Sequence, residues 1–311
     1  MTEWLSVLGS QRRYSPHTID SYRRDLLLLC EHTEGQPLDR LNEGHIRLAV
    51  SRLHAAGHHP RSLARMLSAW RGFYGWWAPR QGMSVNPVTG IKAPKAPRGL
   101  PKALSVDQTQ SLLNRSGMPA PTNAVEWRDQ AMFEVLYSSG LRLAELVSLD
   151  RHPVRGRGYE SVSWIDLEAR EATVFGKGGK TRSVPLGGKA IDALRHWLAH
   201  RHELARVPAT ADADAALFLG SRGARISPRI VQKQLADFAK RAGVPVNVHP
   251  HSLRHSFASH LLQSAQDLRA VQELLGHANI STTQIYTRLD FQHLAKVYDQ
   301  AHPRAQRKRD S

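Results

Sequence analysis

The chain has 311 residues, 41% of them hydrophobic, which is enough for one large domain or two ordinary ones with real cores. Lys and Arg number 43 against 27 Asp and Glu, a formal net charge of +16 that points to a polyanionic partner, most simply nucleic acid. The chain lacks the long apolar run or lipidation signal of a membrane-surface protein, and its first residues lack a secretory apolar core. Its one cysteine, Cys30, lies in a leucine run and is expected to be a buried thiol, so we expect a cytoplasmic protein with no membrane contact.

Residues 1–90 predict a small domain of four helices. Apolar residues recur at helical spacing in four segments, which lie within 4–8, 19–29, 46–53 and 63–77. Ser15, followed by a proline, and Asn42 have the chemistry of helix N-caps. Arginines on the polar faces are either solvated or contact DNA phosphates, which position a protein on the duplex. They are Arg12, Arg13, Arg23, Arg24, Arg61, Arg65 and Arg71.

A basic linker rich in Pro, Gly and Lys is predicted over residues 91–103, and a second domain over 104–311. This second domain is expected to be mainly helical with a small antiparallel sheet. Its first helices are predicted after Ser105 and over about 124–138, and later ones over 188–207 and after Ser227. Short strands are predicted at SVSWIDL, EATVF, TRSVPL and LFLG, with the Gly-rich turn GKGGK closing a hairpin between the second and third. Arg225, Arg229, Lys233, Lys240 and Arg241 are candidates to line DNA.

The stretch 251–286, HSLRHSFASHLLQSAQDLRAVQELLGHANISTTQIY, concentrates polar groups at predicted helix starts and turns. His251 and Arg254 are three apart and share one face of a helix, whereas the apolar residues of that helix recur every four residues. His277 follows a glycine that ends a second helix, and Tyr286 lies in the second turn of a third. These groups can converge on one anion. A tyrosine with cationic partners suits nucleophilic attack on phosphorus, because the cations favour its ionised form and neutralise the phosphate.

Other histidines in this stretch leave alternatives open. His249 and His255 compete with His251 for the same role. His251 and His255 are also four apart, as in zinc-binding helices, but no Glu follows the first His and the chain has a single Cys. We therefore expect neither a metal nor a cofactor.

HSLRHSFASH followed by LLGHANISTTQIYT resembles the signature of the tyrosine recombinases, the phage integrase-like family, and within it the bacterial Xer recombinases. The likeness rests on His-x-x-Arg, then Gly-His, then Tyr nine residues after that His, and it runs over nearly the whole chain. It implies an N-terminal core-binding domain that clamps DNA and an α+β catalytic domain. It further implies that the C-terminal helix docks on a neighbouring protomer and is followed by a basic tail.

The resemblance also implies a catalytic set. Arg142, within SSGLRLAEL, and Arg254 would hold the non-bridging phosphate oxygens, and Glu145 would orient Arg142. Tyr286 would be the nucleophile, with His251 assisting proton transfer. The full set is Arg142, Lys177, His251, Arg254, His277 and Tyr286, in which Lys177 is the general acid and His277 a hydrogen-bond donor.

Two choices within that set follow the family pattern, and one segment departs from it. The spacing to Arg254 selects His251 over its two rivals, and position in the hairpin selects Lys177 over Lys180. The segment 151–163, RHPVRGRGYESVS, is longer than the corresponding loop of the family, so it is either a surface excursion or an added DNA contact.

The function implied is site-specific recombination of double-stranded DNA through a 3′-phosphotyrosine intermediate. A XerD-like recombinase would complete a heterotetramer, and a cell-division DNA translocase would trigger the resolution of chromosome dimers at cell division. One alternative is a nicking-closing enzyme like type IB topoisomerases, which the docking helix argues against. Another is a non-catalytic DNA-binding protein on the same fold, which the complete catalytic set argues against. A metal-dependent hydrolase is more distant, and activity in EDTA would eliminate it.

Overall fold

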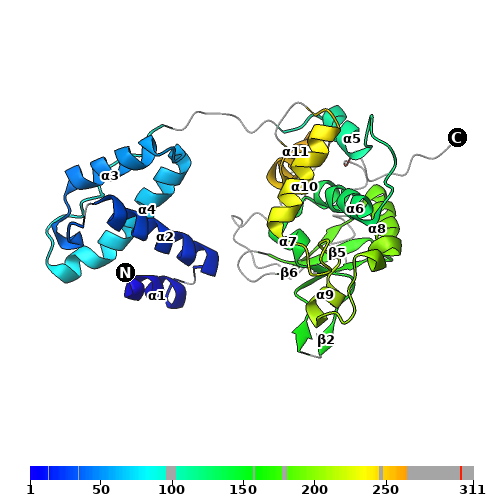
Figure 1. Cartoon of the computed structure of the whole chain (residues 1–311), viewed down its shortest axis with the longest axis horizontal. Helices are drawn as coiled ribbons and strands as arrows, with labels where there is room; N and C mark the ends of the chain where they lie inside the picture. The colour runs from blue at the N-terminus through cyan, green and yellow to red at the C-terminus, as the bar shows by residue number, and fades with distance from the viewer. Residues whose placement is uncertain are drawn as a thin grey trace. The chain divides into compact units, whose positions relative to one another are not determined.

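The structure is a computed structural model of the chain (Figure 1). It describes residues 1–12, 14–33, 35–95, 103–156, 158–176, 181–244, 248–264 and 302. The chain divides into two compact units, Met1–Leu100 and Pro101–Ser311, and each has its own hydrophobic core.

The N-terminal unit contains the four predicted helices. They are α1 (Thr2–Ser10), α2 (Pro16–His32), α3 (Glu43–Ala55) and α4 (Pro60–Trp77), with 3₁₀ turns η1 (Leu38–Arg40) and η2 (Ala78–Gln81). The predicted caps are confirmed: the side chain of Ser15 accepts from the N–H of Thr18, and that of Asn42 from the N–H of His45. Trp70 on α4 is fully buried, and its indole N–H donates to the backbone oxygen of Asp25 on α2 at 2.7 Å, which joins these two helices.

The arginines of this unit do not all face solvent. Arg71 donates to the carbonyl oxygens of Val88 and Ile91, so its guanidinium holds the segment after η2, a structural role that was not predicted. Arg65 pairs with Asp25, a carboxylate that is only 1% exposed and requires a counter-charge. Arg12 and Arg61 are exposed and stay candidates for phosphate contacts.

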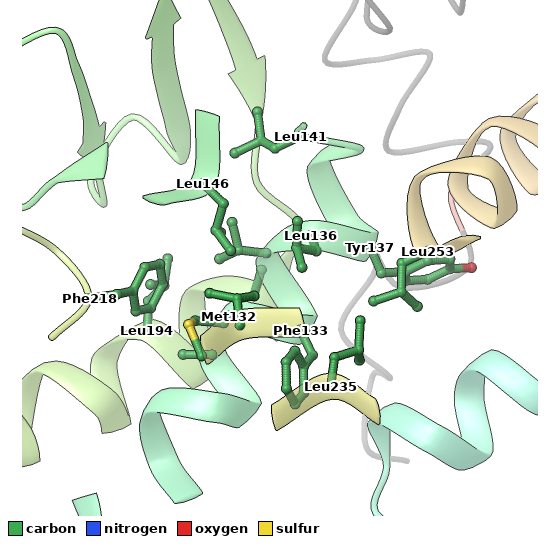
Figure 2. Packing of buried hydrophobic residues seen from close by; sticks show 14 of the residues in the cluster. Met132, Phe133, Leu136, Tyr137, Leu141, Leu146, Leu194, Phe218, Leu235 and Leu253 are labelled. Atoms are coloured by element: carbon green, nitrogen blue, oxygen red, sulfur yellow. The ribbon is translucent and has the colours of Figure 1, made fainter. Parts of the chain in front are cut away.

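The C-terminal unit is built around one buried helix, α6 (Ala124–Ser139). Nearly all of its side chains are buried, whereas a helix at the surface of a domain buries a single face. Figure 2 shows Met132, Phe133 and Tyr137 of this helix packed among side chains from several other helices. The other helices are α5 (Val106–Leu113), α7 (Leu143–Val147), α8 (Gly188–His200), α9 (Ala211–Ala215), α10 (Pro228–Arg241) and α11 (Pro250–Ser264), with the 3₁₀ turn η3 (Arg201–Glu203).

The sheet has the order β1-β4-β5-β6. Its strands are β1 (Leu149–Asp150), β4 (Ser163–Asp166), β5 (Glu171–Phe175) and β6 (Thr181–Pro185). β4, β5 and β6 are antiparallel neighbours, as predicted, but β1 adds an unpredicted parallel edge strand. The segment between β1 and β4 forms its own small hairpin of β2 (Arg155–Gly156) and β3 (Tyr159–Glu160), which returns the chain in the same direction.

The segment LFLG, predicted to be a strand, is buried but is not one. It makes one isolated bridge, between Leu219 and Arg225, because the chain turns back on itself at Gly220–Gly223. Over the residues that the structure describes, no helix combines the length and apolar character needed to cross a membrane.

Candidate active site

Arg142 lies at the corner between α6 and α7. Gly140 ends α6 with φ of 58°, in the left-handed region, and Arg142 is the N-cap of α7. The N–H of Arg142 donates to Oε2 of Glu145 at 2.8 Å, and its guanidinium Nη1 donates to Oε1 at 2.9 Å. The predicted contact between these two residues is confirmed, and it holds Arg142 at both its backbone and its side chain.

Glu145 also binds a second arginine, Arg182 of β6. The two terminal nitrogens of Arg182 contact the two carboxylate oxygens at 2.8 and 3.0 Å. Burial acts to raise the pKa of Glu145, but the hydrogen bonds and charges of Arg182 and then Arg142 outweigh it and hold that pKa below the ordinary value of 4.5. Sequence reasoning missed Arg182. The available signal was strand alternation, because Arg182 shares a face of β6 with the buried Val184.

Arg254 on α11 reaches the same corner from a position far along the chain. Its side chain is buried, and Nη1 donates to the carbonyl oxygen of Gly140. Burial, and then the charge of Arg142, lowers the pKa of Arg254 to about 10, so the group remains protonated at neutral pH. The structure therefore brings Arg142 and Arg254 into electrostatic contact within a partly buried site.

Close packing at this corner makes Gly140 intolerant of a side chain. A Cβ there would lie 2.3 Å from Cδ1 of Phe257, and the φ of 58° is itself unfavourable for other residues. We expect Gly140→Ala to lower the free energy of unfolding of this unit by roughly 2–4 kcal/mol, the sum of backbone strain and overpacking.

The matched control is Gly117→Ala in the same unit, where φ is +75° and no atom lies within 4 Å. It should cost only the backbone strain, about 1 kcal/mol. Urea denaturation monitored by circular dichroism measures both, and equal losses would contradict the clash with Phe257.

Two of the competing histidines, His249 and His251, lie at the start of α11 and have different surroundings. Nδ1 of His249 accepts from the N–H of Ser252 at 3.1 Å, and the N–H of His249 donates to the Ser252 hydroxyl at 2.9 Å. His249 is thus engaged in capping the helix, and burial and then the neighbouring His251 lower its pKa. His251 is exposed in that turn, and by helical spacing it is on the same face as Arg254.

Half of the predicted catalytic set can be placed. Lys177, His277 and Tyr286 lie outside the described residues, as do Lys180, the predicted helices after Ser264 and the docking helix before His302. The predicted hairpin is confirmed by its strands, because β5 and β6 pair as far as Phe175 and Thr181, on either side of residues 176–180. Within the described ranges, no three His, Cys, Asp or Glu side chains are grouped to hold a metal ion.

Arg225 does not line a DNA surface, and that prediction was wrong. Its Nη2 contacts Oδ1 of Asp150 at 2.6 Å, its Nε contacts Oδ1 of Asp212 at 2.7 Å, and its side chain is 17% exposed. The reason is electrostatic: Asp150 is completely buried and requires a counter-charge. On α10, the basic residues predicted to line DNA are exposed and stay predictions: Arg229, Lys233, Lys240 and Arg241.

The lowered pKa of Glu145 predicts an acid-dependent loss of stability. Because the folded-state pKa lies below 4.5, this carboxylate stabilises the fold above about pH 4.5, and the contribution disappears as pH falls through the folded-state value. We expect the melting temperature of the wild type to fall more steeply between about pH 5 and pH 3 than that of Glu145→Gln. Calorimetry over this range measures the difference, with Glu168→Gln, at an exposed position, as the control. Parallel curves for wild type and Glu145→Gln would contradict the assignment.

The comparisons with known proteins show which family the chain belongs to. Residues 102–293 match the phage integrase family, and residues 1–81 match the N-terminal SAM-like domain of phage integrases. The chain is 53% identical over 310 residues to tyrosine recombinase XerC of Ralstonia pickettii, covering 98% of this chain and 94% of that protein. It is 49% identical over 313 residues to tyrosine recombinase XerC of Azotobacter vinelandii, covering 99% and 97%.

Two solved structures show the same fold at lower identity. The XerH site-specific recombinase bound to a palindromic difH substrate has a TM-score of 0.64 and 23% identity, covering 96% of this chain and 84% of that one. The Tn1549 transposon integrase in complex with circular intermediate DNA has a TM-score of 0.68 and 17% identity, covering 94% and 97%.

The chain therefore belongs to the phage integrase family, the tyrosine recombinases. It is a DNA strand transferase that carries out site-specific recombination. Its resemblance to the Xer recombinases, and to those named XerC in particular, is confirmed over nearly the full chain.

Proposed function

We propose that this recombinase cleaves DNA by attack of the Tyr286 hydroxyl on a scissile phosphodiester. A tyrosine–phosphorus bond forms at the 3′ end of one strand, and the bond to the 5′ oxygen breaks to release a 5′-hydroxyl. The observation that carries the proposal is that Arg142 and Arg254 meet at the corner after α6, where the Arg254 guanidinium donates to the carbonyl oxygen of Gly140, two residues before Arg142. The charges that act on Arg254 within the described residues are those of Arg142, Arg182 and Glu145. Together with Arg254 itself, three guanidinium groups and one carboxylate gather here, an arrangement that favours an anion.

The two arginines would bind the non-bridging oxygens, because a guanidinium matches phosphate geometry and stays charged. His251, exposed at the start of α11, would assist removal of the tyrosine proton. His277 would donate a further hydrogen bond to the phosphate. Lys177 would protonate the departing 5′ oxygen, since an alkoxide is a poor leaving group without a proton.

The covalent intermediate conserves the free energy of the broken phosphodiester. Attack by the 5′-hydroxyl of another strand reverses the chemistry and releases Tyr286. We therefore propose that exchange proceeds without ATP or a metal ion, with the positive charge supplied by arginine and lysine.

In this proposal, residues 1–90 are the DNA-clamping domain, 91–103 a basic linker, and 104–311 the catalytic domain with a protomer-docking helix and basic tail. A XerD-like recombinase would complete a heterotetramer on a recombination site, in which each pair of subunits exchanges one pair of strands. This tetramer would resolve chromosome dimers at cell division, and a DNA translocase would trigger the reaction. It would act in the cytoplasm, at the nucleoid. The high identity to proteins named XerC over both domains supports this assignment.

The test is capture of the covalent intermediate. The protein is incubated in EDTA with its XerD-like partner and a duplex that carries the recombination site of the host chromosome. The duplex is nicked next to the cleavage point, so that a short fragment leaves and traps the reaction. We expect a protein–DNA band that resists denaturation, and mass spectrometry of its peptides should locate the linkage at Tyr286. Linkage at another residue, or bound DNA with no covalent band, would overturn the proposal.

Two other activities make different predictions in the same assay. A nicking-closing enzyme would relax supercoiled plasmid without a partner recombinase and without a specific site. A non-catalytic binding protein would shift the duplex in a gel and form no covalent band.

A further inference from the structure

Ser256 and His260 belong to the motif HSLRHSFASH, but the proposed reaction uses neither of them. Both side chains are buried on α11, one helical turn apart, and both bind the backbone of Leu104. The Ser256 hydroxyl accepts from the N–H of Leu104 at 2.8 Å, and Nε2 of His260 donates to the Leu104 carbonyl oxygen at 2.8 Å. Two side chains of α11 therefore satisfy both backbone polar groups of one buried residue.

Leu104 directly follows the predicted linker and directly precedes Ser105, the N-cap of α5. The imidazole that binds it is fixed from its other side as well, because Nδ1 of His260 accepts from the Tyr137 hydroxyl at 2.9 Å. Burial lowers the pKa of His260 despite the hydrogen bond to Leu104, so the ring is neutral at pH 7. A neutral ring can donate at Nε2 while it accepts at Nδ1, as both contacts require.

These hydrogen bonds supply what the hydrophobic contacts of α11 cannot. Leu253, Phe257 and Leu261 hold the helix in the core, but apolar contacts are non-directional and permit small rotations and shifts. Hydrogen bonds tolerate only a narrow range of distance and angle, so they define the position of the helix along and about its axis. Arg254 lies two residues before Ser256 and is carried by this same part of the helix.

We infer that Ser256 and His260 are positioning residues for strand cleavage, which hold α11 to Leu104 so that Arg254 meets the scissile phosphate in the reactive geometry. This inference rests on the proposed function. The rival interpretation is purely structural, in which the two hydrogen bonds only add to the stability of the fold. The two interpretations differ in which contact of His260 matters to the reaction, and in whether the defect depends on the charge of the phosphate.

The experiment compares two replacements of His260 on the nicked duplex under single-turnover conditions. His260→Gln can donate to Leu104 from the place of Nε2 but loses the acceptor for Tyr137, whereas His260→Asn keeps that acceptor and is too short to reach Leu104. We expect His260→Asn to cleave at least about tenfold more slowly than wild type, because a small misplacement of a phosphate ligand is costly. His260→Gln should stay within about threefold of wild type. Tyr137→Phe is the matched control, since it removes the hydroxyl at the other side of the ring, and it should cleave at the wild-type rate even where its melting temperature falls.

A second duplex carries a methylphosphonate at the cleavage position, in which a methyl group replaces one non-bridging oxygen and the reacting group is uncharged. A misplaced guanidinium matters less to this substrate, so His260→Asn should cleave it within about threefold of the wild-type rate. A general loss of folded structure would slow the cleavage of both duplexes alike. Melting temperatures and gel shifts of all variants are measured alongside, and DNA affinity should stay within about twofold of wild type.

Three results would overturn the inference and leave the proposed function intact. They are a wild-type rate for His260→Asn on the phosphodiester, equal rates for His260→Asn and His260→Gln, and a defect of His260→Asn that is equally large on both duplexes. If the wild type does not cleave the methylphosphonate, the comparison of the two replacements decides. If His260→Asn does not fold, Ser256→Ala, which removes the other hydrogen bond to Leu104, is tested on both duplexes in its place. Absence of covalent product from the wild type on the phosphodiester would overturn the proposed function itself, and this inference with it.

Discussion

Tyr286→Phe is expected to abolish covalent complex formation on a nicked duplex, lowering the cleavage rate by at least about 10⁴-fold. The substitution removes one oxygen atom, the nucleophile in the proposed reaction, and leaves no other group to form the phosphotyrosine bond. DNA affinity should be unchanged, because we propose that basic residues of both units, and not this hydroxyl, hold the DNA. Denaturing gels with end-labelled DNA measure the rate, and gel shifts measure the affinity.

The described tyrosines of the catalytic unit are unsuited to replace it. Tyr137 is fully buried in the core beneath α11 (Figure 2). Burial, and then the hydrogen bond to Asp150, raises the pKa of Tyr159 to about 12. Tyr159→Phe is therefore the matched control, because it removes a tyrosine hydroxyl of the same unit and should leave the covalent band in place. A band that persists in Tyr286→Phe would show that another residue is the nucleophile.

Arg225→Met is expected to lower the free energy of unfolding of the catalytic unit by about 3–5 kcal/mol. The carboxylate of Asp150 is fully buried, and methionine would leave it with only the Tyr159 hydroxyl as a side-chain hydrogen-bond donor among the described contacts. An unbalanced charge in the interior costs much more than the intact pair contributes. Arg225 also donates to the carbonyl oxygens of Val147 and Leu149. In Arg225→Met each of these oxygens would lose one hydrogen-bond donor.

Removing both charges tests this explanation. Arg225→Met with Asp150→Asn should recover part of the loss, because the buried negative charge is then absent. Arg155→Met at its exposed pair should leave the urea midpoint unchanged. If Arg225 were instead a DNA contact, Arg225→Met would keep its stability and would bind DNA with a smaller dependence on salt.

The site joins three separate elements of the catalytic unit. Arg142 is on the corner after α6, Arg182 on β6, and Arg254 on α11, which packs on the buried α6. The hydrophobic core holds α6 and α11 together. Tyr137 of α6 and Leu253 of α11 both belong to this core (Figure 2). Such placement on regular elements suits a reaction that requires oxygens of one phosphate to be held in a fixed geometry.

Local structure was determined by the sequence on its own. Ser15, Asn42, Ser105 and Ser227 each cap the helix predicted after them, because a cap uses only groups within three residues. The β5–β6 hairpin likewise follows from two short β-branched runs and the Gly-rich turn between them. The resemblance to the family selected Arg142 through the motif SSGLRLAEL, and His251 and Arg254 through the His-x-x-Arg spacing.

Only the tertiary structure decided which arginines are structural and which remain for DNA. An arginine of a short segment looks the same in sequence whether it is solvated, binds phosphate or balances a buried carboxylate. Arg225 lies 75 residues from Asp150, and Arg182 lies 37 from Glu145. The cost of burying each carboxylate arises only when the fold removes it from water, and the guanidinium that offsets this cost is chosen by position in space. For the same reason the parallel edge strand β1 could not be predicted, since its partner is defined by packing and not by its two residues.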